Sequence, residues 1–237
     1  MRALLDGGLR QADAVLACSS WVARELAACG VEASPLHPPV PAPGPRYRRE
    51  RAAEPVLLYV GRLVPEKGPD LLLRAFAVAA RAHPRARLRL AGDGPMRGEL
   101  VRLAGELGIG AAMELLGRLP FARVEEELAR AWSLVAPSRW AEPFGLAAAE
   151  AITRGVPVVA SAAGGHAETL EAGSTALLVR NGDVTELAEA LRAILAGRAF
   201  PSGKLPAAAV ERARRRHAEA RHTEAIRAVF ADVTGAA

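Results

Sequence analysis

Short apolar runs alternate with amphipathic stretches over most of this chain, and this alternation constrains the fold more than any other feature. Val56 to Val60 is a continuous apolar run, as expected for a strand that is covered on both faces. Short, mostly apolar segments follow at 88–91, 113–116, 133–136, 156–160 and 176–179, with helical periodicity between them. Strands that alternate with helices of this length predict an α/β fold with a doubly wound parallel sheet.

The first forty residues are predicted to form a small unit of their own. Their pattern indicates a strand, a helix and a strand at 12–17, 21–28 and 36–37. Such a βαβ unit lacks sheet partners, so we expect it to be marginally stable or to dock on something. The predicted organisation is therefore a small unit at 1–40, a linker at 41–54 and a main domain at 55–237 that ends in helices.

The linker is rich in proline and ends in arginines. Such a stretch cannot pack a core, so we expect a charged tether that faces solvent. Lys plus Arg exceed Asp plus Glu by 31 − 26 = 5, which suits anionic ligands or an acidic membrane surface. There is no basic stripe interleaved with aromatics, and nucleic acid is not an expected partner.

The stretch E-P-F-G-L-A-A-A-E places two acids around a turn and a helix. Pro143 biases Glu142 toward an extended backbone, and Gly145 lets main chain approach a ligand. Glu150 lies inside the helix predicted over Leu146 to Arg154. Two carboxylates and free N–H groups around one pocket suit a polyhydroxylated ligand. The alternative is a capped surface helix with two solvated acids.

Two cationic residues follow the first strand of the main domain. The segment G-R-L-V-P-E-K-G begins at Gly61 and contains Arg62 and Lys67. Ligands of open α/β sheets bind at the carboxyl ends of strands, so these side chains are placed to hold one diphosphate. The alternative is a loop with exposed charges.

Two further junctions carry candidate residues. Arg118 and Leu119 follow the third strand, and Arg118 can also be interpreted as a surface charge. G-G-H-A-E follows the fifth strand, where two glycines leave free N–H groups and room for a ligand. Glu168 in this segment could equally be an acid that complements the helix dipole. We expect His166 to be a cap or a surface residue without a chemical role.

These motifs, taken in order, resemble the family-4 retaining glycosyltransferases, known as glycosyl transferases group 1. They are G-R-L-x-x-x-K-G, V-x-P-S, E-x7-E with F-G after the first acid, and G-G-x-x-E, and the resemblance covers roughly 56–195. It implies the GT-B fold, whose two domains have Rossmann-like sheets. The main domain would be the C-terminal, donor-binding half, and 1–40 a remnant of a truncated N-terminal domain.

The resemblance also implies a function and a set of site residues. It implies transfer of a hexose-type sugar from a UDP or GDP sugar to a hydroxyl acceptor with retention, and no tightly bound cofactor or metal. The implied catalytic residues are Glu142, Arg62 and Lys67. The implied donor-binding residues are Gly61, Arg118, Leu119, Phe144, Gly145, Leu146, Glu150, Gly164, Gly165 and Glu168.

Two alternatives follow from the short N-terminal unit. The chain is either such a transferase or a catalytically incomplete sugar-nucleotide-binding module, and a partner chain could supply the acceptor domain. No apolar run is long enough to span a bilayer, and the first residues lack the apolar core of a signal peptide. We therefore expect a cytoplasmic protein with at most peripheral contact at the inner face of the membrane.

Overall fold

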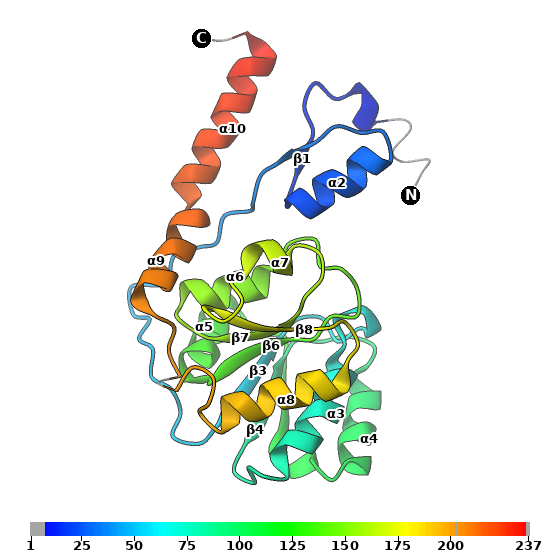
Figure 1. The fold of residues 1–237 in the computed structure, drawn as a ribbon, viewed down its shortest axis with the longest axis vertical. Coiled ribbons are helices and arrows are strands. Elements are labelled where there is room, and N and C mark those ends of the chain that lie inside the picture. The colour runs from blue at the N-terminus through cyan, green and yellow to red at the C-terminus, as the bar shows by residue number, and fades with distance from the viewer. Residues whose placement is uncertain (1–7, 202, 236–237) are drawn as a thin grey trace.

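A computed structural model describes residues 8–201 and 203–235, and its main domain is built on one parallel sheet (Figure 1). The strand order is β5-β4-β3-β6-β7-β8. The strands are β3 (Val56–Val60), β4 (Arg87–Ala91), β5 (Met113–Gly117), β6 (Ser133–Ala136), β7 (Val158–Ser161) and β8 (Ala176–Val179). The doubly wound parallel sheet predicted from the sequence is confirmed.

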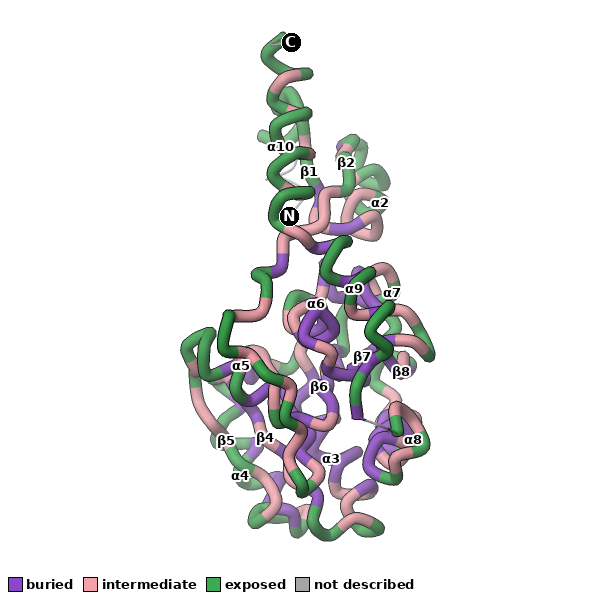
Figure 2. Tube along the Cα trace, turned by 90° about the vertical axis from the view of Figure 1, so that its left-hand side faces the viewer, coloured by how far each residue is buried: buried purple, intermediate pink, exposed green. Residues whose placement is uncertain are grey.

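Helices cover both faces of this sheet, and each face has its own apolar core. One face carries α3 (Pro69–Ala80), α4 (Arg97–Glu106) and α8 (Val184–Leu195), and the other carries α5 (Phe121–Arg130), α6 (Leu146–Thr153) and α9 (Ala207–Arg216). Leu57 and Tyr59 of β3 point into the first core, whereas Leu58 points into the second. Figure 2 shows that the buried residues concentrate along the sheet and the inward helix faces.

Short helices complete the connections between these elements. They are η2 (Pro65–Lys67), η3 (Gly110–Ala112) and α7 (His166–Thr169), whereas η1 (Leu9–Gln11) lies near the N-terminus, outside the main domain. The strand order reverses between β3 and β6, because β4 and β5 lie on one side of this pair and β7 and β8 on the other. The connections leave the sheet in opposite directions there, which opens a crevice outside the carboxyl ends of the two strands.

The N-terminal unit is smaller than the sequence pattern suggests. It consists of β1 (Leu16–Ala17), α2 (Ser20–Ala28) and β2 (Ser34–Pro35), and the two strands pair in parallel with each other. The predicted strand at 12–17 was too long, and the predicted strand at 36–37 was two residues too late. The rest of the predicted unit, residues 1–7, lies outside the described residues.

The last helix, α10 (Glu219–Thr234), leaves the main domain and runs beside this small unit (Figure 1). None of its residues is buried. Its apolar side chains Ile226, Val229 and Phe230 face Leu16 across a groove of about 350 Å³. None of the described helices combines the length and the apolar character that a membrane span requires.

The linker is bound to the main domain instead of forming a solvent-facing tether. Arg154, at the end of α6, is the largest fully buried side chain and pairs with Glu125 at 2.7 Å. The same guanidinium donates to the Pro41 carbonyl, and Glu125 accepts from the Gly44 N–H. The linker runs over this buried pair, and its backbone satisfies polar groups that the core leaves unpaired.

The linker arginines bind backbone carbonyls and one aromatic ring. Arg49 donates to the carbonyls of Leu128, Ala129 and Gly203, and burial lowers its pKa. Arg51 stacks over the Trp132 ring at 3.9 Å. The expectation of a solvated tether failed because composition does not show how many acceptors the neighbouring helix ends offer.

We expect Arg154→Ala to lower the free energy of unfolding by about 3–5 kcal/mol, because it removes a fully buried side chain and leaves the half-buried Glu125 carboxylate without its cation. Arg215→Ala is the matched control, since Arg215 pairs with Glu211 on the exposed surface of α9 and such pairs contribute less than about 1 kcal/mol. Urea denaturation and limited proteolysis of residues 41–54 measure both effects. Equal stability of the two variants would contradict the anchoring role.

His217 follows α9 and is buried where the small unit meets the main domain. Its ring packs 5.5 Å from Phe144 and 6.0 Å from His37, and within the described part of the chain neither of its ring nitrogens has a hydrogen-bond partner. Burial, assisted by His37 and Arg216, lowers the pKa of His217 to about 4. The folded state therefore holds this ring neutral.

Because the folded protein protonates His217 less readily than the unfolded chain, this residue's contribution to stability is complete above pH 6.5 and is lost toward about pH 4. The loss is at most about 1.4 kcal/mol per pH unit. His217→Phe should remove this part of the pH dependence, whereas His83→Phe should keep it. Urea midpoints measured between pH 4 and pH 7 test this, and parallel curves for both variants would refute it.

Candidate functional site

A cavity of about 330 Å³ opens at the carboxyl ends of β3 and β6, where the strand order reverses. The residues predicted from the sequence that line it are Gly61, Arg62, Lys67, Glu142, Gly145, Leu146 and Glu150. The structure thus gathers residues from two distant segments, which the sequence placed at separate strand ends, around one space. Tyr59, Ser138 and His166 also line it.

A second cavity of about 540 Å³ lies over the ends of β3, β4 and β5. Gly61 and Arg62 line both cavities, and the second also contains Arg118 and Leu119. Arg62 therefore lies at the boundary, with its side chain exposed. The two cavities form one crevice with a cation at its centre and an apolar residue, Leu119, at one end.

Lys67 and Glu142 form the centre of the first cavity. The Lys67 ammonium donates to both carboxylate oxygens of Glu142, at 2.6 and 2.8 Å, and the Ser138 hydroxyl donates to one of them. Burial by itself would raise the pKa of Glu142, but these hydrogen bonds outweigh it and hold the pKa below its ordinary value. Glu142 is therefore an ionised acceptor despite being 6 % exposed.

The turn that carries Glu142 is held by backbone contacts with the two glycines after β7. The Gly165 N–H donates to the Glu142 carbonyl at 2.6 Å, and Gly164 pairs with Glu142 as an isolated bridge. A Cβ at Gly164 would lie 2.2 Å from that carbonyl oxygen, and one at Gly165 would lie 2.5 Å from the Pro143 oxygen. Side chains at these positions would push the acidic turn away, so the glycines fix where Glu142 lies.

Helix α6 begins at the cavity. Its N-cap, Gly145, has φ 87, and no side chain caps the helix. Residues 145–148 line the cavity, so the first N–H groups of the helix are available there to oxygen atoms of a ligand. Glu150, one turn further, is half-buried, and burial raises its pKa although Arg154 opposes the shift. The second acid is therefore less acidic than the first.

Four predicted site residues line neither cavity: Gly164 and Gly165, which hold the acidic turn, and Phe144 and Glu168. The Phe144 side chain packs with Val40 and Ala149, and Phe144 does not line either cavity. The Glu168 carboxylate accepts from the N–H groups of Ser20 and Trp21, at 2.8 and 2.6 Å. These hydrogen bonds complement the N-terminus of α2, and they lower the pKa of Glu168 against the effect of burial. Glu168 thus joins the small unit to the main domain.

His166 was expected to be a cap or a surface residue, and the structure shows a different environment. Its side chain is 1 % exposed and lines the cavity beside Glu142. The sequence contained a usable signal, because the histidine directly follows two glycines at a strand end. That segment lies against the acidic turn only in the folded chain, so the sequence alone could not show what the ring faces.

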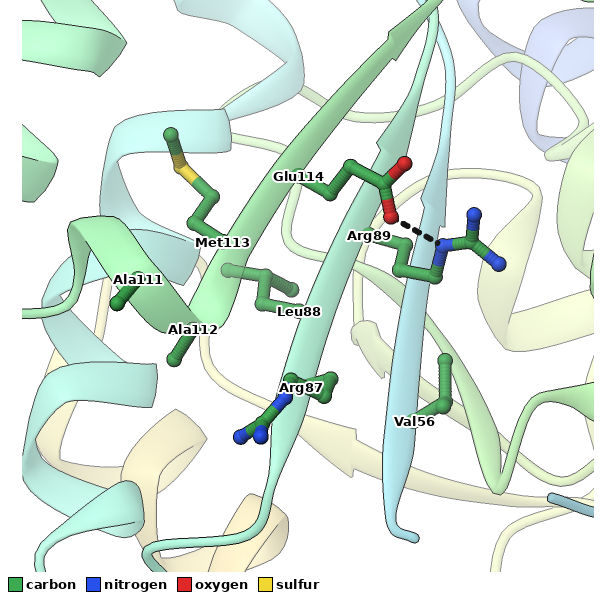
Figure 3. Close-up of a pocket in the computed structure, with 8 residues that line it drawn as sticks. All are labelled: Val56, Arg87, Leu88, Arg89, Ala111, Ala112, Met113 and Glu114. Carbon is green, nitrogen blue, oxygen red and sulfur yellow. Dashed lines mark ion pairs between the residues drawn. The ribbon is translucent and has the colours of Figure 1, made fainter.

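A separate cavity of about 560 Å³ lies at the other end of the sheet (Figure 3). Val56, Leu88 and Met113 contribute to it at the start of β3, β4 and β5. Its charged side chains are already paired, since Arg89 bridges Glu114 and Glu127 at 3.0 and 2.6 Å. It is large but lacks the convergent free polar groups of the crevice at the carboxyl ends. Among the described residues, no cluster of His, Cys, Asp and Glu could hold a metal ion.

Comparison with known proteins gives a consistent result. Residues 46–216 match the family Glycosyl transferases group 1. A D-inositol 3-phosphate glycosyltransferase from Nocardia farcinica is 40% identical over 152 residues, which are 61% of this chain and 34% of that protein. A glycogen synthase from Mycobacterium tuberculosis is 38% identical over 167 residues, which are 70% of this chain and 38% of that protein. The chain thus spans about a third of the length of these relatives.

Solved structures agree on the fold. HepE from Anabaena, in complex with UDP and glucose, superimposes with a TM-score of 0.87 at 22% identity, over 98% of this chain and 66% of that one. Sucrose-phosphate synthase from Thermosynechococcus elongatus gives 0.84 at 27% identity, over 100% and 61%. The six-stranded parallel domain is thus that of GT-B glycosyltransferases. Since the family match covers well over half of the residues of this chain, the chain belongs to the glycosyl transferases group 1 family.

Proposed function

We propose that this chain is the donor-binding part of a retaining glycosyltransferase. It would take a hexose-type sugar from a nucleoside diphosphate of the UDP or GDP type and transfer it to a hydroxyl acceptor. The observation that carries the proposal is the pairing of Lys67 with a buried, ionised Glu142 beside Arg62, at the reversal of strand order. Cations for a diphosphate and an acceptor for hydroxyls then face one space.

The charges in the crevice suggest a role for each residue. Arg62 and Lys67 would hold the diphosphate and stabilise the negative charge that develops on it as the sugar leaves. Glu142 would accept from sugar hydroxyls, and its hydrogen bonds to Ser138 and Lys67 fix its orientation. Glu150, whose carboxylate has no hydrogen-bond partner among the described residues, would accept from the ribose hydroxyls.

The second cavity would hold the base. Leu119 offers an apolar wall for a planar ring, and Arg118 offers N–H donors beside it. Gly164 and Gly165 would contribute by placing the acidic turn, and Gly145 by leaving the helix N-terminus open to the donor. HepE, which superimposes on this chain, is described in complexes with UDP and with UDP-glucose, and this supports a UDP-type donor.

A second candidate function is a donor-binding module that needs a partner chain for its acceptor domain. The small sheet favours it, because within residues 8–201 and 203–235 β1 and β2 pair only with each other. Leu16, Phe230 and Val233 are exposed beside the groove between the small unit and α10. Uncovered strand edges and apolar side chains at one place suit contact with further polypeptide.

Arg62→Ala should weaken binding of UDP or GDP by about 1.5–3 kcal/mol, because a charge-assisted contact to phosphate is lost. The guanidinium is exposed and has no partner in the described part of the chain, so the fold should be unaffected. Isothermal titration calorimetry measures the change, with Arg74→Ala on the exposed side of α3 as the control. Unchanged affinity in Arg62→Ala would show that the diphosphate lies elsewhere.

Titration of the purified chain with UDP-, GDP- and ADP-sugars, followed by assays for sugar release and transfer, tests the proposed function. We expect binding of at least one donor. Turnover by the isolated chain would favour the transferase, and binding without turnover would favour the module. Binding of none of these donors would refute both proposals.

A further inference from the structure

His166 presents a hydrogen-bond acceptor of known position. Its Nδ1 lies 3.0 Å from the Ser161 carbonyl oxygen. A carbonyl oxygen only accepts, so Nδ1 must carry the proton, and Nε2 of the neutral ring carries a lone pair. Burial lowers the pKa of His166 although the nearby Glu142 carboxylate opposes the shift, which favours this neutral form.

The edge of the His166 ring that carries Nε2 lies at the N-terminus of α6, against Gly145. A Cβ at Gly145 would lie 2.6 Å from Nε2 and 2.3 Å from Cδ2, so only glycine leaves room for the ring. Gly145 and His166 both line the first cavity. Among the described residues no hydrogen-bond donor reaches Nε2. This nitrogen is also not among the unpaired side-chain nitrogen and oxygen atoms that are fully buried. Its free lone pair is therefore available to a ligand in the cavity.

Two acceptors thus lie in the wall of one small space. Glu142 and His166 are close enough for the carboxylate to influence the ring, and the single ammonium of Lys67 is already shared with Glu142. A ligand that satisfies both acceptors needs two neighbouring donors. Hydroxyls on adjacent carbons of a sugar ring meet this requirement, because each can donate one hydrogen bond.

We propose that Nε2 of His166 accepts a hydrogen bond from a donor-sugar hydroxyl adjacent to the one held by Glu142. His166 is then a specificity-determining residue that selects donors with both hydroxyls intact. This inference rests on the proposed function of the crevice as a nucleotide-sugar site. It predicts that His166 acts on the sugar and has no effect on the nucleotide.

Calorimetry with UDP and UDP-glucose, or with GDP and GDP-glucose if guanosine is preferred, separates these contributions. His166→Leu should weaken binding of the sugar nucleotide about fivefold to tenfold, the size of one neutral hydrogen bond, and leave the affinity for UDP or GDP unchanged. His166→Gln, whose amide oxygen can accept, should recover part of the loss. An analogue that lacks the matching hydroxyl should bind wild type and His166→Leu equally.

The possible failures are distinguishable. Wild type that binds neither UDP nor GDP would refute the proposed function of the crevice. Normal nucleotide binding with equal UDP-glucose affinity in wild type and His166→Leu would overturn only the role of His166. If His166→Leu lost affinity for UDP and for UDP-glucose equally, His166 would have a structural role, and its proposed contact with the sugar would be overturned as well. If the wild-type protein bound every deoxy analogue as tightly as the intact sugar nucleotide, the proposed contact of His166 with a sugar hydroxyl would also be overturned.

Discussion

The crevice depends on one partly buried ion pair, between Lys67 and Glu142. A carboxylate that is 6 % exposed is costly to ionise unless a cation and further donors compensate for the lost water. Lys67 comes from the loop after β3, and Ser138 and Glu142 come from the loop after β6. The pair therefore ties together two strand ends that diverge at the reversal of strand order. It also leaves a defined negative acceptor at the floor of the cavity.

A second constraint is the close approach of backbones beneath that pair. The glycines after β7 lie against the turn that holds Glu142, at distances that no side chain would allow. Gly145 plays the same part for the imidazole of His166. Because main chain is less mobile than a long side chain, these contacts fix the acceptors of the cavity before a ligand arrives. Such preorganisation is what an electrostatic role in transfer requires.

The sequence predicted the main domain well and the periphery poorly. The six strands were found because each is a short, mostly apolar segment between helical stretches, and parallel pairing follows from that alternation. The N-terminal strands were misplaced, because two-residue pairings leave almost no periodic signal. The linker was expected to be solvated, yet Arg154 and Glu125 bind its backbone from beneath. Composition cannot reveal such acceptors and donors, since they belong to helices that are distant in the sequence.

What the sequence determined by itself was the set of strand ends and the polar residues that follow each of them. Order and spacing were enough to predict the fold and the family, because a parallel sheet brings its carboxyl ends to one edge. Only the tertiary structure decided which residues share a space. It placed the Glu168 carboxylate at the N-terminus of α2 and the Phe144 ring against His217. It also placed His166 in the wall of the cavity. Neighbours across a loop junction are set by packing between segments far apart in the chain, and local pattern carries no record of that packing.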